Sequence, residues 1–128
     1  MPVLGLDYGL ARTGVAVSDA TQTLARPLGI VQRAGTPDGL DHLAALVDEH
    51  AVERIVVGLP LTLRGVRGEQ AIATEVFVEE LRSRVAVPVE TYDERFTTTL
   101  AARTPSKAPE DALAAAHLLQ GWLDRASG

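Results

Sequence analysis

The stretch Val3–Gly9 constrains the fold of this chain more than any other feature. It is a short apolar run that ends in the carboxylate of Asp7 and then turns at Gly9. Apolar runs bounded by glycine are typical of buried strands. A carboxylate at the end of a buried strand is costly unless a metal ion, a basic side chain or backbone N–H groups compensate its charge. We therefore expect Asp7 to be the first ligand of a metal site, with the other acids supplied from later in the chain.

Length and composition indicate one globular domain that spans residues 1–128. The chain is 46% hydrophobic and 23% charged, close to globular averages. No apolar run approaches the roughly 20 residues needed to cross a bilayer. The N-terminus leads straight into a strand, so we expect no signal peptide, no membrane partner and a cytoplasmic location. The absence of cysteine excludes disulfides, thiolate metal sites and a cysteine nucleophile.

The net charge of −5 weakens the case for a nucleic-acid-binding protein without removing it. A site built from carboxylates carries acids by design, and its hold on phosphate can be local. All basic residues except Lys107 are arginines, which suit bidentate phosphate contacts.

The order of predicted elements indicates an α/β fold. The short connection between the first two strands predicts an antiparallel hairpin, which a third strand extends into a meander. Later strands alternate with helices and should pair in parallel, which gives a five-stranded mixed sheet with helices on both faces. The expected strands cover 3–7, 14–19, 28–32, 54–58 and 85–92, and the expected helices 37–50, 69–84, 97 or 98 to 103, and 109–124.

The second of these helices is amphipathic. Apolar residues recur along it at helical spacing, so one side is expected to pack on the sheet. The residues assigned to this inner side are Ala73, Val76, Phe77 and Leu81.

Acidic residues recur where the predicted elements end or begin. Asp7 ends the first strand, Asp93 and Glu94 end the fifth, and Glu110 and Asp111 lie in the first turn of the last helix. Sites in open α/β sheets form beyond the carboxyl ends of parallel strands, which places these acids at one edge. Asp111 also begins the apolar stripe of its helix. Each acid has a plainer explanation: Asp7 could cap its own turn, the strand-five pair could be solvated, and acids favour the first turn of any helix.

Clustered carboxylates without cysteine or a histidine pair suit Mg²⁺ or Mn²⁺. Such sites hydrolyse phosphodiesters by a two-metal route, in which one ion activates water and the other stabilises the leaving oxygen. Basic residues in loops on the side inferred to carry the acids could hold the phosphate backbone, although Arg64 and Arg67 also fit as plain surface residues. These candidates for nucleic-acid binding are Arg12, Arg64, Arg67, Arg95 and Lys107.

Five segments in series resemble the YqgF/RuvX family of bacterial RNase H-like nucleases, and the resemblance covers essentially the whole chain. The segments are Gly5–Gly9, Gly14–Asp19, Val57–Leu61, Asp93–Thr98 and Asp111–Ala115. The resemblance implies an RNase H-like fold and a divalent-metal nuclease. The family is described both as Holliday junction resolvases and as nucleases that mature the 5′ end of pre-16S rRNA.

Position by position, the resemblance implies that Asp7, Glu94 and Asp111 are the catalytic acids and the metal ligands. Asp93 is the alternative to Glu94, because adjacent strand residues face opposite ways. The chain departs from the family pattern at Ala11, where a basic residue is usual, and in the Gly-Leu-Pro loop at Thr62–Val66. It also has a short segment, Leu100–Pro109, where the family usually carries a longer basic stretch.

The sequence therefore predicts a metal-dependent endonuclease that acts on branched DNA or on precursor rRNA. Junction resolution would need two active sites and hence a homodimer. Two other functions remain open. One is a nucleotide-binding module, since an Asp-x-Gly turn before a meander also occurs in actin-like and sugar-kinase ATPases. The other is a nucleic-acid-binding or protein-binding adaptor of the same fold without catalysis.

Overall fold

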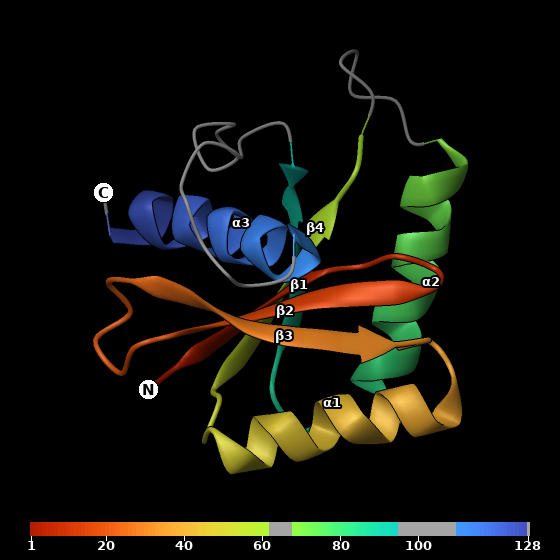
Figure 1. Cartoon of the computed structure of the whole chain (residues 1–128), viewed down its shortest axis with the longest axis horizontal. Helices are drawn as coiled ribbons and strands as arrows, with labels where there is room; N and C mark the ends of the chain where they lie inside the picture. Colours follow the sequence, from red (N-terminus) through yellow and green to blue (C-terminus); the bar gives the residue numbers. More distant parts are fainter. Residues whose placement is uncertain (62–67, 95–109, 128) are drawn as a thin grey trace.

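The computed structural model describes residues 1–61, 68–94 and 110–127 (Figure 1). Within these ranges the strands and helices follow the predicted order. The strands are β1 (Val3–Asp7), β2 (Arg12–Ser18), β3 (Ala25–Gln32), β4 (Arg54–Leu59) and β5 (Val89–Asp93). The helices are α1 (Pro37–Glu49), α2 (Glu69–Arg82) and α3 (Glu110–Ser127). The expected short helix from 97 or 98 to 103 lies outside the described residues.

The strands form one five-stranded sheet in the order β3-β2-β1-β4-β5. The first three strands form an antiparallel meander, whereas β4 and β5 continue the sheet from β1 in parallel. This is the mixed sheet that the sequence predicts. Because β1, β4 and β5 run in the same direction, their carboxyl ends meet at one edge, which therefore carries Asp7 and Asp93.

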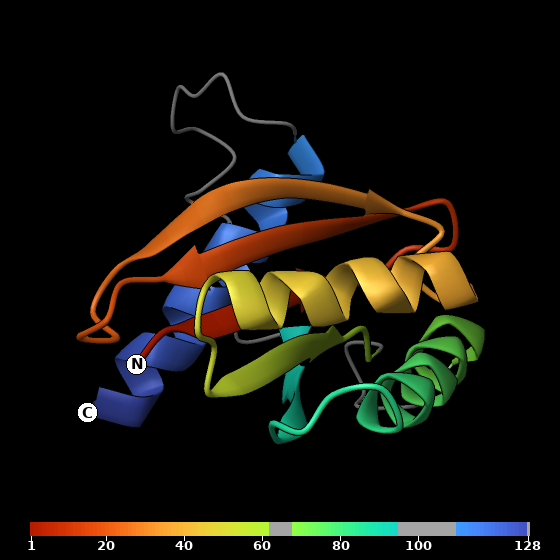
Figure 2. The ribbon, with the colours of Figure 1, turned by 90° about the horizontal axis from the view of Figure 1, so that it is seen from below.

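Helices cover both faces of the sheet, with α1 and α2 on one face and α3 on the other (Figures 1 and 2). Alternation along β1 explains the two cores. Leu4 and Leu6 belong to the cluster beneath α1 and α2, whereas Val3 belongs to the cluster beneath α3. Asp7 has the same parity as Val3, so its side chain is on the α3 face, and Tyr8 packs against the other cluster.

Three strands begin at other residues than expected. β2 begins at Arg12, two residues earlier than expected. β3 begins at Ala25 and includes Pro27, which pairs with Ala16 where the register shifts by a bulge. A bulge accommodates a proline that cannot donate a ladder hydrogen bond. β5 begins only at Val89, because Pro88 precedes the strand and contributes its carbonyl oxygen to Ile55.

The predicted inner face of α2 is half wrong. Phe77 and Leu81 are buried as expected, but Ala73 and Val76 are exposed. The buried stripe is rotated around the helix and also uses a polar side chain, that of Thr74, which donates to the Gln70 carbonyl oxygen at 2.8 Å. A polar residue in the stripe hides the true face from a count of apolar residues. Val76 is thus left on the surface, 55% exposed.

None of the helices in the described ranges has the length and apolar character needed to cross a bilayer.

Candidate active site

Asp7 lies at the carboxyl edge of the sheet with a glycine beside it on each neighbouring strand. Asp7 itself pairs with Gly14 on β2. On the other side, Leu6 of β1 pairs with Val57 of β4 in parallel. The next residues along these two strands, Asp7 and Gly58, therefore lie side by side. Glycine within a strand often marks a close approach by another backbone or a ligand. Both glycines here make room for another acidic residue.

Gly14 makes room for the start of α3. A Cβ atom at this position would collide with the backbone carbonyl oxygen of Asp111 and would lie 3.1 Å from the backbone nitrogen of Ala112. The first turn of α3 therefore rests directly on β2, one strand away from Asp7. Farther along the helix, Gly5 allows a similar approach, because a Cβ there would lie 2.7 Å from the Cβ of Leu119.

Gly58 makes room for Glu94. A Cβ atom on Gly58 would lie 2.5 Å from Oε1 of Glu94 and 2.8 Å from Cδ2 of Leu118. Glu94 lies just past the end of β5, and its side chain shares a hydrogen bond with that of Asp7. Of the two acids at the end of β5, Glu94 is thus the one hydrogen-bonded to Asp7, and Asp93 is near enough to act on it electrostatically.

The carboxyl groups of Asp7 and Glu94 lie close together and are partly shielded from water, and both conditions raise their pKa values. Burial raises the pKa of Glu94 to about 7, with further contributions from the charge of Asp7, their hydrogen bond and the charge of Asp93. Burial also raises the pKa of Asp7, and the charge of Asp111 acts in the same direction, while the hydrogen bond from Glu94 opposes it. The pair therefore retains a proton at pH values where isolated carboxyls have lost theirs.

Asp111 is the third acid at this edge and has a cationic partner. Its Oδ2 lies 3.3 Å from Nε of Arg12, the first residue of β2. Both side chains are well exposed, at 36% for Asp111 and 62% for Arg12, so the ion pair contributes at most about 1 kcal/mol. A stronger ligand for either side chain, a cation for Asp111 or a phosphate for Arg12, could replace it.

The donor set of the three acids fits a hard divalent cation. It consists only of carboxylate oxygens, which Mg²⁺ and Mn²⁺ prefer. A cation would also relieve the repulsion that raises the pKa values of Asp7 and Glu94. Within the described ranges, however, no three acidic or histidine side chains form a group at metal-binding distance. Asp111 pairs with Arg12 and acts on Asp7 through its charge rather than through a contact.

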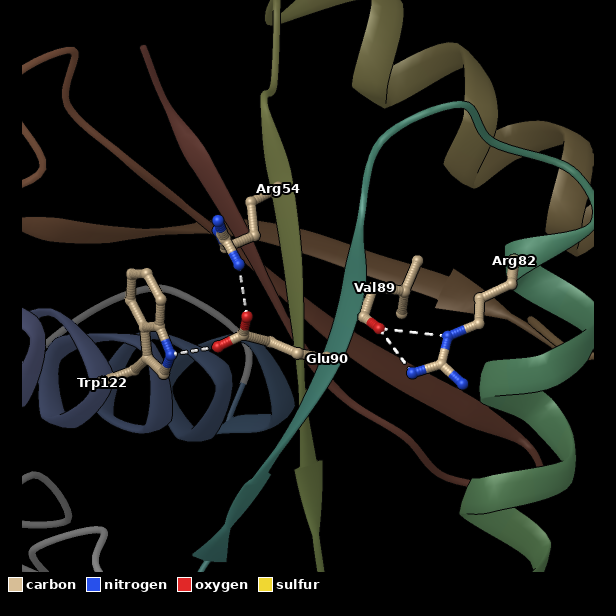
Figure 3. A network of polar contacts seen from close by, with 5 residues as sticks. All are labelled: Arg54, Arg82, Val89, Glu90 and Trp122. Atoms are coloured by element: carbon tan, nitrogen blue, oxygen red, sulfur yellow. Dashed lines mark hydrogen bonds and ion pairs between the residues drawn. The ribbon is translucent and has the colours of Figure 1, made fainter.

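Polar contacts fix β5, the edge strand that leads to Glu94 (Figure 3). On one side Glu90 accepts hydrogen bonds from Trp122 Nε1 at 2.7 Å and from Arg54 Nη1 at 2.5 Å. On the other side Arg82 donates twice to the carbonyl oxygen of Val89, from Nε at 3.1 Å and from Nη2 at 2.7 Å. The strand is thereby tied to α3 and α2 at once, so the elements that carry Glu94 and Asp111 are joined.

The structure locates only part of the predicted nucleic-acid contacts. Arg12 lies beside Asp111, at the acidic edge. The other four predicted residues, Arg64, Arg67, Arg95 and Lys107, lie outside the described residues, as does the whole of the short segment Leu100–Pro109. Their assignment stays a prediction.

Sequence reasoning missed the residues that support the acids. The sequence predicts Gly14 at the turn that opens the second strand and Gly58 at the end of the fourth, with no role in the site, although a glycine inside a strand is a recognised sign of close approach. The contacts of Glu90 with Trp122 and Arg54 have no such sign, because they join residues that are 32 and 36 positions apart.

Comparison with known proteins identifies the family to which this chain belongs. A family model described as "RuvX: Holliday junction resolvase" matches residues 1–125. A protein of Chloroflexus aggregans named "Putative pre-16S rRNA nuclease" is 41% identical over 95% of this chain and 92% of its own length. A protein of Syntrophomonas wolfei with the same name is 37% identical over 99% of this chain and 96% of its own.

Two solved structures share the fold. The Thermus thermophilus RuvC in complex with a Holliday junction substrate superposes with a TM-score of 0.60 at 17% identity, covering 100% of this chain and 96% of that one. The fowlpox virus resolvase in complex with Holliday junction DNA gives a TM-score of 0.51 at 10% identity, covering 99% and 96%. At these identities the likeness shows the fold alone. The predicted RNase H-like fold is confirmed.

Proposed function

Because this chain belongs to the RuvX family, and because three acids from separate elements lie at one edge of its sheet, we propose that it is a divalent-metal-dependent endonuclease acting on structured nucleic acid. The observation that carries the proposal is the contact of Asp7 with Glu94, in which burial and mutual charge raise the pKa of Glu94 to about 7. Such perturbed pairs are characteristic of functional sites.

We assign Asp7, Glu94 and Asp111 as the residues that hold Mg²⁺ or Mn²⁺, with Asp93 as the alternative to Glu94. When bound, two such ions would activate a water molecule and stabilise the leaving oxygen of a phosphodiester. The chain itself supplies the geometry: β1 fixes Asp7, Gly58 leaves space for Glu94, and Gly14 sets the start of α3. Glu94 must lose its proton before it can act as a ligand, so metal binding should release protons near neutral pH.

Arg12 is proposed to hold the substrate phosphate. Its guanidinium is largely exposed and stands next to Asp111, so a phosphate placed at the acids would be within its reach. Arginine can meet a phosphate through two parallel hydrogen bonds, which also orients it. Arg64, Arg67, Arg95 and Lys107 would extend the contact along the backbone of the substrate.

The names of the relatives point to two substrates. Curated relatives carry the name of a pre-16S rRNA nuclease, and the family model that of a Holliday junction resolvase. Symmetric cleavage of a four-way junction would require two active sites and therefore a homodimer, whereas trimming the 5′ end of an rRNA precursor would not. A cytoplasmic location is part of this proposal.

Incubation of the purified protein with Mn²⁺ or Mg²⁺ tests this proposal. Four-way DNA junctions and a precursor carrying the 5′ end of 16S rRNA would be compared side by side, with the protein's mass measured in solution. We expect metal-dependent cleavage of at least one substrate, abolished by EDTA. A strict monomer that leaves junctions intact would refute the resolvase role, and failure to cleave either substrate with either metal would refute the proposal.

A further inference from the structure

An apolar groove opens on the face of the sheet opposite the acids, directly next to Asp7 in the chain. It has a volume of about 600 Å³, within the range of roughly 300–1,000 Å³ typical of small-molecule sites. One wall is the turn between β1 and β2, and the other is α2, which lies alongside that turn in Figure 1. The residues that line it include Tyr8, Leu10, Arg33, Val76, Phe77 and Glu80.

The floor of the groove is aromatic. The rings of Tyr8 and Phe77 stack with their centroids 4.4 Å apart and an interplanar angle of 16°. The rim is unusually apolar for a surface, because Leu10 is 84% exposed and Val76 is 55% exposed. Binding of a planar apolar group between these side chains would remove their apolar surface from water, which is favourable in free energy.

Two arginines connect this groove with the acidic edge. The backbone N–H of Arg33 donates to the carbonyl oxygen of Ala11 at 2.9 Å, so Arg33 is fixed beside the residue that precedes Arg12. Arg12 lies next to Asp111, whereas Arg33 is exposed and lines the groove. Within the described ranges the Arg33 guanidinium makes no ion pair. The two cations thus mark a path around the sheet edge from the acids into the groove.

One carboxylate completes the lining. Glu80 is near enough to Tyr8 that its charge, together with the larger effect of burial, raises the pKa of the Tyr8 hydroxyl. A carboxylate accepts hydrogen bonds only, so it suits a ligand edge that carries N–H donors. Guanine presents two neighbouring N–H donors on its Watson–Crick edge, which one carboxylate can meet together.

We propose that this groove binds an unpaired nucleotide of the nucleic-acid substrate, next to the phosphodiester held at the acids. The base would lie among Leu10, Val76 and the aromatic floor, and its phosphate would meet Arg33. This inference rests on the proposed nuclease function, because it takes the polynucleotide at Asp7 as the source of the nucleotide. Continuity favours it, since Tyr8 follows Asp7 directly and their Cα atoms are about 3.8 Å apart.

The alternative occupant is a second copy of this chain, for which exposed apolar residues would also serve. A cation at the groove and a second cation leading from it toward the acids favour a phosphate-bearing ligand. A flat protein surface would also leave much of a 600 Å³ hollow unfilled. The mass of the wild type and of the two variants in solution distinguishes these two occupants.

Binding of 5′-GMP would be followed by NMR in EDTA, so that no cleavage is needed for the readout. Val76→Glu places a repelling carboxylate in the groove. Ile72→Glu adds the same charge one turn earlier on α2, at a residue that is 49% exposed and outside the groove lining. We expect GMP to shift the signals of Tyr8, Leu10 and Arg33. Val76→Glu should raise the Kd at least about tenfold, and Ile72→Glu less than about twofold.

The inference is overturned if GMP leaves the groove signals unmoved or if both variants weaken binding equally. It is also overturned if the wild type is a dimer that Val76→Glu, but not Ile72→Glu, converts to a monomer, since the groove is then an interface between copies. The proposed nuclease function is refuted by a different result. If the protein binds GMP in the groove but cleaves no substrate with Mn²⁺, the nuclease proposal is wrong and the groove proposal stands.

Discussion

The proton held between Asp7 and Glu94 should make the metal-free protein less stable as the pH rises. The pKa of Glu94 is raised from 4.5 to about 7 in the folded protein. Between these values the native state binds more protons than the unfolded state, so the free energy of unfolding falls with increasing pH. The contribution of Glu94 is complete below about pH 4.5 and is lost as the pH rises through about 7. The raised pKa of Asp7 acts in the same direction.

The magnitude follows from the shift. The rise of the Glu94 pKa from 4.5 to about 7 corresponds to a change in the free energy of unfolding of at most about 3.4 kcal/mol. Glu94 is only half-buried, and solvent screens its charge, so we expect about 1–2 kcal/mol. That amount is a measurable fraction of the stability of an ordinary domain.

Urea unfolding in EDTA at about pH 5.5 and about pH 8 measures this loss, with Glu94→Gln as the matched control. The glutamine keeps the shape and cannot ionise, so the variant should lose about 1–2 kcal/mol less than the wild type between the two pH values. Saturating Mn²⁺ should remove most of the difference in the wild type, because the cation replaces the proton. Equal pH dependence in wild type and variant would refute the electrostatic description of the pair.

Three further variants test the support of the site. Gly14→Ala should cost about 1–3 kcal/mol in urea unfolding, because its Cβ meets the backbone of Asp111, and should weaken Mn²⁺ binding in calorimetry; unchanged metal affinity would mean that α3 does not set the position of Asp111. Arg12→Gln should change stability by less than about 1 kcal/mol while raising KM for a cleaved substrate roughly tenfold, the loss of one charge-assisted phosphate contact; an unaltered KM would remove Arg12 from the substrate site. Glu90→Gln should cost about 0.5–1.5 kcal/mol in thermal unfolding, because Arg54 loses its ionic partner. Asp41→Asn, which removes an exposed ion pair with Arg84 away from β5, should cost less, and equal effects would show that the contacts of Glu90 stabilise the fold no more than an exposed ion pair does.

The parts of the fold that follow from short-range patterns could be predicted from the sequence. The short link before Gly14 forces a hairpin, and Thr36 with Pro37 marks the start of α1, where the Thr36 hydroxyl accepts from the backbone N–H of Gly39. The alternation of strands and helices after residue 50 predicts the parallel half of the sheet. Because the carboxyl ends of β1 and β5 share one edge, the meeting of Asp7 with an acid at the end of β5 was foreseeable.

Long-range packing could not be predicted in the same way. The exposed position of Val76 depends on which side of α2 the sheet selects, and the polar Thr74 belongs to the buried side. The roles of Gly14 and Gly58 depend on where α3 and Glu94 come to rest, which no local pattern reveals. The groove beside Tyr8 arises in the same way, because it forms only when α2 lies against the β1–β2 turn.

The central claim is that Asp7 is a ligand in a metal-dependent nuclease centre. Asp7→Asn tests it most directly, by Mn²⁺ titration and by cleavage of the junction and rRNA substrates on the same sample. We predict loss of high-affinity Mn²⁺ binding and at least about a hundredfold slower cleavage, with an unchanged fold by circular dichroism, because a neutral side chain cannot hold the ions. Full cleavage by Asp7→Asn in the presence of Mn²⁺ would contradict the account.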